Sequence, residues 1–198
     1  MRISLTGEGN KTYEIRVIEV VEHDATLINT MIDIDLMTFS EPTWSRYTAG
    51  LMLRHGRTFL LLSEDKPIGT CQCLRSWKDP SEAVLFSMAI RPGWRGHGLG
   101  TFFLQEVLDA LAIAGCKRVV LEVDPRSAWA IRVYEEKFGF EQIAEYENEY
   151  GPGHNRVHMR LDLEPPAPVV LTEVSWPAEE ADPESPQAPH CPPSTPPG

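Results

Sequence analysis

The sequence predicts a mixed α/β domain, because apolar segments with strand spacing alternate with segments of helical spacing over most of its 198 residues. The clearest strand, residues 83–90, is almost wholly apolar and leads into a basic, glycine-rich hexapeptide, Arg95-Gly96-His97-Gly98-Leu99-Gly100. After the hexapeptide, apolar residues recur on one helical face, at Leu99, Phe102, Phe103, Val107, Ala110, Leu111 and Ala114. A strand, a glycine loop and a helix in this order indicate a sheet with helices packed on it.

Local patterns define the other elements in order. Before the hexapeptide we expect a strand at residues 13–21, helices at 25–39 and 44–54, and strands at 57–62 and 68–77 around a turn at Glu64-Asp65-Lys66-Pro67. The long helix after the hexapeptide should end at Gly115, which suits a helix C-cap. A strand at 118–123, a helix that starts at Asp124-Pro125 or Ser127 and ends near Gly139, and strands at 140–146 and 157–163 complete the domain.

Residues 164–198 differ in composition from the rest of the chain. They hold 11 of the 17 prolines and six acidic residues, without any Lys or Arg. A proline-rich acidic segment cannot build β-ladders or bury much apolar surface. We therefore expect one folded domain at residues 1–163 and a flexible tail at residues 164–198.

Charge and hydropathy exclude several classes of protein. The net charge is −11, of which −5 belongs to residues 1–163, and an acidic domain argues against a nucleic acid partner. Residues 1–11 are polar, unlike a secretory signal, and the longest apolar runs are too short to span a membrane. We therefore expect a cytoplasmic protein without a membrane partner, either a monomer or a homodimer.

We expect no metal site from the cysteine and histidine spacing. Cys71 and Cys73 alternate along a predicted strand and face one side of it, which packing explains. His154 and His158 are too far apart along a strand to share one ion unless a turn intervenes. The four cysteines also lack the spacing of a disulfide framework.

The hexapeptide has the chemistry of a phosphate-binding loop. Its glycines allow close backbone approach, the first N–H groups of the following helix have no helical partner, and the helix dipole favours an anion. It is not a Walker loop, since no Gly-Lys-Ser/Thr follows, and its glycines are too close together for a dinucleotide fingerprint. The alternative is a tight strand-to-helix turn without a ligand.

Two further residues have the chemistry of proton transfer. Glu122 lies within the apolar strand at residues 118–123, where we expect it to be buried and suited to accept a proton. The alternative is a carboxylate at the strand end that faces solvent. Tyr134 follows on a helix, and its phenol, with an ordinary pKa of about 10, stays protonated and able to donate. The alternative for Tyr134 is a core aromatic on the face shared with Ala130.

In combination these motifs resemble the GNAT family of N-acetyltransferases over residues 13–163. Arg95, Gly98 and Gly100 match the coenzyme A loop of that family, Arg/Gln-x-x-Gly-x-Gly/Ala. The family's later signatures are matched in order and spacing by Leu121-Glu122-Val123, Ala130, Tyr134 and Gly139-Phe140. The resemblance implies a mostly antiparallel sheet of six to seven strands, flanked by helices, with a central parallel pair that splays apart.

The resemblance also implies the cofactor and the roles of several residues. Acetyl-CoA would be the acyl donor, with its pyrophosphate on the loop Arg95, Gly96, His97, Gly98, Leu99, Gly100 and Thr101. Its pantetheine arm would pair with the backbone of Met88, Ala89 and Ile90, one of whose N–H groups would polarise the acetyl carbonyl. Ser127 would contact the cofactor where the family usually has Asn. Glu122 would be the base, and Tyr134 the acid for the departing thiolate.

The acceptor of the acetyl group is less well defined. The Leu-Glu-Val and Tyr arrangement is similar to bacterial ribosomal-protein N-terminal acetyltransferases of the RimI type, and so are the segments 39–44 and 146–150. Thr43 interrupts the Pro-Trp pair of that group, and its Tyr-Tyr pair is not intact around Tyr150. A peptide N-terminal amine is our expected acceptor. A lysine, a small amine such as a polyamine, amino acid or aminoglycoside, and a non-catalytic acyl-CoA-binding role are the alternatives.

Overall fold

A computed structural model of the chain describes residues 2–6, 12–22, 25–39 and 45–164. These residues lie in the first of two compact units, residues 1–166, whereas the second unit, residues 167–198, is outside the described part. The predicted tail and most of the segment 39–44 also lie outside the described residues, so both stay predictions. None of the described helices is long and apolar enough to cross a membrane.

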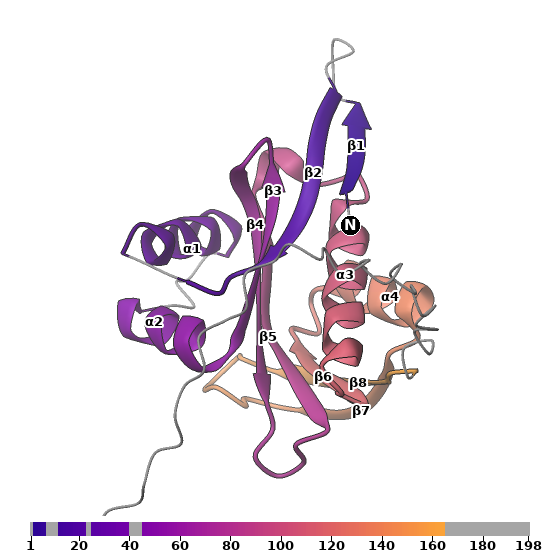
Figure 1. The fold of residues 1–198 in the computed structure, drawn as a ribbon. Coiled ribbons are helices and arrows are strands. Elements are labelled where there is room, and N and C mark those ends of the chain that lie inside the picture. The colour runs from indigo at the N-terminus through magenta and orange to yellow at the C-terminus, as the bar shows by residue number, and fades with distance from the viewer. Residues whose placement is uncertain (1, 7–11, 23–24, 40–44, 165–198) are drawn as a thin grey trace, which may run out of the picture. The chain divides into compact units, whose positions relative to one another are not determined.

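The described strands form one mixed sheet of eight strands in the order β1-β2-β3-β4-β5-β6-β8-β7 (Figure 1). Neighbouring strands are antiparallel except β5 and β6, which are parallel. The strand bounds are β1 Arg2–Thr6, β2 Thr12–Glu19, β3 Arg57–Ser63, β4 Lys66–Arg75, β5 Glu82–Ile90, β6 Arg118–Val123, β7 Glu141–Tyr146 and β8 Arg156–Asp162. The predicted fold class, with one parallel pair in a mostly antiparallel sheet, is confirmed.

The strand β1 was not predicted and makes the sheet one strand larger than the expected six to seven. It pairs with β2 in antiparallel register, with Leu5 opposite Tyr13. Ile3 and Leu5 alternate with polar residues and pack against the edge of the main core. Two apolar residues are a weak local pattern, and the pairing with β2 supplies the remaining stabilisation.

Helices cover both faces of the sheet (Figure 1). The helices α1 (Ala25–Thr38) and α2 (Arg46–His55) contact each other and lie over β3, β4 and β5. The helices α3 (Leu99–Ile113) and α4 (Ala128–Val133) lie on the opposite face, and α4 continues into a π-helical turn, η3 (Tyr134–Phe138). A short 3-10 turn, η2 (Pro92–Trp94), connects β5 to the glycine loop.

The main core lies between the sheet and α3. Its α3 side is formed by Leu99, Phe103, Leu104, Val107, Leu108 and Leu111, all nearly inaccessible to solvent. Arg57 and Arg75 donate to the carbonyls of Ala110 and Ala114 at 2.9 and 3.1 Å, and so stabilise the C-terminal end of α3. Burial and these caps fix the axis of α3, and therefore the position of its N-terminal end beside β5.

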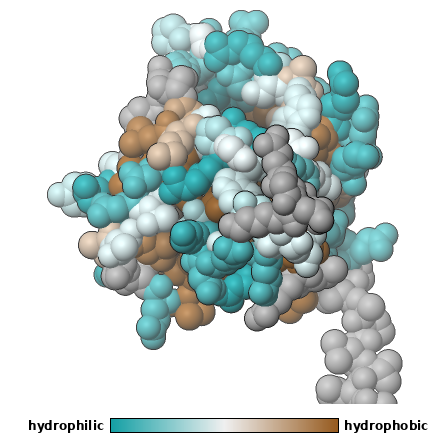
Figure 2. All heavy atoms as spheres, turned by 90° about the horizontal axis from the view of Figure 1, so that it is seen from above, coloured by the Kyte–Doolittle hydropathy of each residue, from teal (hydrophilic) through white to brown (hydrophobic). Residues whose placement is uncertain are grey.

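Cys71 and Cys73 both lie in this core as free thiols, as the packing interpretation predicted. Their mutual hydrogen bond and burial raise the pKa of the Cys71 thiol well above its usual value. At the surface, the face shown in Figure 2 is largely hydrophilic, with hydrophobic residues in separate groups rather than one patch.

Candidate active site

The parallel pairing of β5 and β6 ends halfway along β5. It runs from Glu82 opposite Arg118 to Leu85 opposite Leu121, and no later residue of β5 pairs with β6 in the described ladder. On its other edge β5 stays paired with β4 up to Ile90, after an irregularity in the register between Gln72 and Cys73. The two parallel strands therefore separate beyond Leu85, as the resemblance implied.

This separation turns backbone groups of β5 toward an open edge. Arg91 N–H donates to the carbonyl of Ile68 on the β4 side at 2.8 Å. Because backbone groups alternate along a strand, Met88 and Ile90 direct theirs to the opposite edge, where β6 has separated. The Ile90 carbonyl there accepts from Arg95 Nε at 3.0 Å. Ala89, between them, is paired toward β4 with Thr70 opposite it.

The glycine loop follows β5 and ends at the N-terminus of α3. Gly96 and Gly98 have φ values of 82° and 73°, a conformation that favours glycine, and no neighbouring atom lies within 4 Å of a Cβ built on either. Gly98 precedes the helix, whose first turn contains Leu99, Gly100 and Thr101. The N–H groups of that turn have no carbonyl four residues earlier in the helix. An anion at this end of α3 would meet several free donors and the positive end of the dipole.

Side chains of the loop have distinct roles. The Leu99 side chain is buried in the core and holds the start of α3, so only its backbone is available to a ligand. Arg95 and His97 are exposed, but the Arg95 side chain is fastened to Ile90 by its Nε donor. Arg95 therefore links the loop to the open edge of β5, in addition to supplying positive charge.

The expected burial of Glu122 is wrong. Strand alternation puts Val119, Leu121 and Val123 on the face covered by α3, and Glu122 on the other face. The helices α1 and α2 cover β3, β4 and β5 on that other face but not β6, so about a third of the Glu122 side chain is exposed. The carboxylate is thus available to a ligand from solvent.

Glu122 is surrounded by polar side chains that the sequence analysis did not group with it. The Tyr150 hydroxyl donates to Glu122 Oε2, and burial together with this carboxylate raises the pKa of Tyr150 to about 12. His158, directly opposite Glu122 on β8, has its Nε2 3.6 Å from Glu122 Oε1 and 3.3 Å from Glu149 Oε2. The register of β6 with β8 is the signal that relates His158 to Glu122.

Tyr134 lies at the start of η3 and packs against the main core. Its ring is 5.6 Å from the ring of Phe140, centroid to centroid. Burial raises the pKa of Tyr134 to about 12, so the phenol is protonated at neutral pH. Tyr134 belongs to the α3 side of the sheet and Glu122 to the other side, and within the described residues the two side chains share no hydrogen bond.

Ser127 precedes the first residue of α4 and is exposed. Its hydroxyl makes no hydrogen bond to the backbone of the helix, although its backbone N–H donates to Asp124 O at 2.8 Å. Arg126 pairs with Asp124 beside it and lowers the pKa of that carboxyl to about 2. The Ser127 side chain is therefore exposed and does not cap α4, and its role in cofactor binding stays a prediction.

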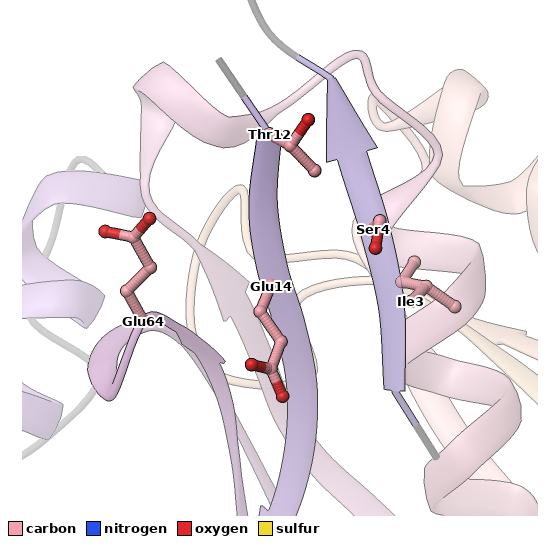
Figure 3. Close-up of a pocket in the computed structure, with 5 residues that line it drawn as sticks. All are labelled: Ile3, Ser4, Thr12, Glu14 and Glu64. Atoms are coloured by element: carbon pink, nitrogen blue, oxygen red, sulfur yellow. The ribbon is translucent and has the colours of Figure 1, made fainter.

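A separate hollow lies near the edge of the sheet, between β1, β2 and the turn after β3 (Figure 3). It is lined by Ile3, Ser4, Thr12, Glu14 and Glu64. None of these residues belongs to the predicted site, and the hollow is open to solvent. We therefore assign the site to the open edge of β5 instead.

The fold is that of N-acetyltransferases. It resembles the ribosomal-protein-S18-alanine N-acetyltransferase of Escherichia coli with a TM-score of 0.65 at 23% identity, over 79% of this chain and 98% of that one. It also resembles a chain of the NatC complex bound to Gag peptide and CoA, with a TM-score of 0.66 at 18% identity, and a Bacillus subtilis acetyltransferase in complex with CoA, with a TM-score of 0.62 at 16% identity. These two matches each cover 76% of this chain and 99% of the other.

The Acetyltransferase (GNAT) family matches residues 26–140, more than half of the chain, and the chain belongs to this family. Among curated proteins, the [Ribosomal protein bS18]-alanine N-acetyltransferases of Salmonella typhimurium LT2 and Escherichia coli K12 are each 36% identical over 69 residues. The matched segment covers 35% of this chain and 46% of each relative, so it spans less than half the length of the curated relatives.

Proposed function

We propose that this protein transfers the acetyl group of acetyl-CoA to a primary amine, most specifically the N-terminal amine of a protein or peptide. The observation that carries the proposal is the end of the β5–β6 pairing at Leu85, next to a glycine loop at the start of a buried helix. Beyond Leu85, β5 has an edge without a neighbouring strand, and an anion site follows at the start of α3. These two features suit a long thioester with a pyrophosphate at one end.

The donor would bind along this path. N–H groups of Leu99, Gly100 and Thr101 would hold the pyrophosphate, and the open edge at Met88 and Ile90 would pair with the amide groups of the pantetheine arm. One N–H group of that edge would polarise the thioester carbonyl. Family membership supports this donor, as do the relatives of similar fold that were solved with CoA bound.

The chemistry then needs one proton acceptor and one proton donor. The amine nitrogen attacks the thioester carbonyl, so that the C–N bond forms and the C–S bond breaks. Glu122 takes the proton released by the amine, directly or through water, and Tyr134 gives its phenolic proton to the departing thiolate. The exposure of Glu122 and the raised pKa of Tyr134 support these roles, because the first leaves the base accessible and the second keeps the acid protonated.

The choice of acceptor rests on two supports. The curated relatives carry the name of an alanine N-acetyltransferase that acts on ribosomal protein bS18. The second support is energetic: an α-amino group, with a pKa of about 7.7–8.0, needs about 1.3 kcal/mol to lose its proton at pH 7, whereas a lysine needs about 4.6 kcal/mol. An exposed carboxylate such as Glu122 suits the α-amino group, whose deprotonation costs less free energy.

Acetylation of a peptide panel tests the proposal. The full chain is incubated with acetyl-CoA and either peptides with different first residues, a lysine peptide blocked at its N-terminus, or small amines, and acetylated product is measured by mass spectrometry. Peptides with a free N-terminus should react with the highest kcat/KM. A small amine that outcompetes every peptide would move the acceptor to that class, and CoA binding without turnover of any amine would identify a binding domain.

Two variants test the assigned roles. Glu122→Gln and Tyr134→Phe should each lower the rate by tenfold or more, because general acid or base catalysis contributes about 10²–10⁴-fold. Glu141→Gln is the matched control, since Glu141 is an exposed carboxylate on β7 that pairs with Arg160 and has no role in the proposed site. Unchanged rates in both active-site variants would overturn the roles of Glu122 and Tyr134.

A further inference from the structure

Three side chains beside the open part of the sheet converge on one point. Glu122 comes from β6, His158 from β8, and Glu149 from the turn between β7 and β8, and we call them the Glu-Glu-His cluster. One ligand atom of each lies within 4.8 Å of the other two. His158 Nε2 lies 3.3 Å from Glu149 Oε2 and 3.6 Å from Glu122 Oε1.

The imidazole of His158 is held in place but its Nε2 is not satisfied. The ring meets the Tyr146 ring edge-on, with 4.7 Å between centroids, and the strand register fixes it opposite Glu122. Nε2 itself is inaccessible to solvent and makes no hydrogen bond with any described residue, although two carboxylate oxygens lie nearby. A buried imidazole nitrogen without a hydrogen bond, aimed between two carboxylates, has the geometry of a metal ligand.

The separations within the cluster suit a tetrahedral ion. Zinc bonds of about 2.0–2.2 Å to nitrogen and oxygen separate neighbouring ligand atoms by about 3.3–3.6 Å in a tetrahedron. The two distances from His158 Nε2, 3.3 and 3.6 Å, already match this spacing, and the ligand atoms of the two carboxylates lie within 4.8 Å of each other. Two carboxylates and a neutral imidazole also balance the charge of a divalent cation.

A supporting contact orients one of the carboxylates. The Tyr150 hydroxyl donates to Glu122 Oε2, which leaves Oε1 directed toward His158. The Arg156 guanidinium lies 5.2 Å from the centre of the Tyr150 ring and packs on it. Hydrogen bonds to the ligating carboxylate are typical of built metal sites because they fix its direction. Between about a quarter and a third of each cluster side chain is exposed, so an ion can enter from solvent.

We propose that the Glu-Glu-His cluster binds Zn²⁺ through Glu122, Glu149 and His158, and that the bound ion inhibits acetyl transfer. Three protein ligands leave a fourth position for water. The inhibition rests on the proposed function, because an ion on Glu122 Oε1 occupies the lone pair that would accept the amine proton. In the sequence, His158 has a spacing that relates it only to His154, so this site was not predicted.

Cobalt substitution tests binding without any need for activity. The full chain, first treated with a chelator, is titrated with Co²⁺, and the visible absorption of four-coordinate cobalt is followed and then displaced with Zn²⁺. We expect one ion per chain, and at least tenfold weaker binding in His158→Gln and in Glu149→Gln. His154→Gln is the matched control, because His154 lies with Glu149 in the connection between β7 and β8 but does not belong to the cluster. Circular dichroism checks that the variants are folded.

The outcomes separate the two parts of the proposal. Absence of the four-coordinate spectrum, or an unchanged affinity in the folded His158→Gln variant, overturns the zinc site and leaves His158 as an ion-pair partner of the two carboxylates. Wild-type binding with Zn²⁺ inhibition that persists equally in His158→Gln overturns the inhibitory role, because the inhibiting ion then acts elsewhere. A chain that binds cobalt as expected but acetylates no amine would contradict the proposed function and retain the metal site.

Discussion

Gly69 on β4 lies where a side chain would separate the strands at the proposed acetyl site. A Cβ at this position would lie 2.9 Å from the Ala89 carbonyl oxygen, 3.1 Å from Ile90 Cγ1 and 3.2 Å from Leu61 Cβ. The shortest of these contacts is to backbone, which cannot rotate away as a side chain can. In Gly69→Ala the β5 strand must therefore move away from β4 by a few tenths of an ångström, at Ala89 and Ile90.

The expected cost follows from the crowding. Overpacking of a filled core lowers the free energy of unfolding by about 1–3 kcal/mol. For a domain of this size, each kcal/mol lowers Tm by about 2–4 °C, so Gly69→Ala should unfold about 2–12 °C below the parent chain. The kcat/KM for acetyl transfer should fall as well, because the displaced segment contains the open edge at Met88 and Ile90.

Thermal unfolding followed by circular dichroism and a CoA-release assay measure the two effects. Gly93→Ala is the matched control, since a Cβ on Gly93 meets nothing within 4 Å and its φ is not in the left-handed region. The control should retain both Tm and kcat/KM. A Gly69→Ala chain with the Tm and the rate of the parent would refute the reasoning, because the β4–β5 contact would then tolerate a methyl group.

Other residues give predictions of the same kind. Phe103→Ala should cost about 3–5 kcal/mol in urea unfolding because the ring is fully buried, whereas Ile113→Ala, at an exposed position of the same helix, should cost little. Gly98→Ala should weaken CoA binding measured by calorimetry and cost about 1–2 kcal/mol, because alanine resists a φ of 73°. The pKa of Asp124 is about 2 in the folded chain against 3.8 normally, so stability should fall as pH drops from about 4 to about 2, and Asp124→Asn should flatten that part of the pH profile.

The sequence predicted the strand, glycine loop and helix of the proposed donor site better than the surroundings of Glu122, for a physical reason. The glycine loop and α3 depend on residues close together in the chain, whose spacing already fixes a strand, a turn and an amphipathic helix. The exposure of Glu122 depends instead on which strands α1 and α2 cover, and that is a property of the assembled sheet. Alternation in 118–123 places Glu122 on the face opposite Val119, Leu121 and Val123, but it does not show whether a helix covers that face.

The Glu-Glu-His cluster was beyond prediction for a related reason. Glu122 and His158 meet only through the register of β6 with β8, which pairs residues 36 positions apart in the chain. A shift of one residue would turn His158 to the opposite face. The strand β1 likewise depends on its pairing with β2, because its two apolar residues are too weak a pattern to predict a strand.

The buried thiols of β4 make the opening of the sheet measurable. Cys71 lies opposite Met88, and Cys71, Cys73 and Cys116 are all enclosed in the core. Since a thiol reagent reacts with the thiolate, and burial suppresses both access and ionisation, labelling of Cys71 requires β4 and its neighbours to part transiently. The labelling rate therefore reports how often the sheet opens locally at β4. A ligand bound along β5 should lower this rate. Cys191 lies outside the described residues, and replacing it by Ser leaves only the three buried thiols to react.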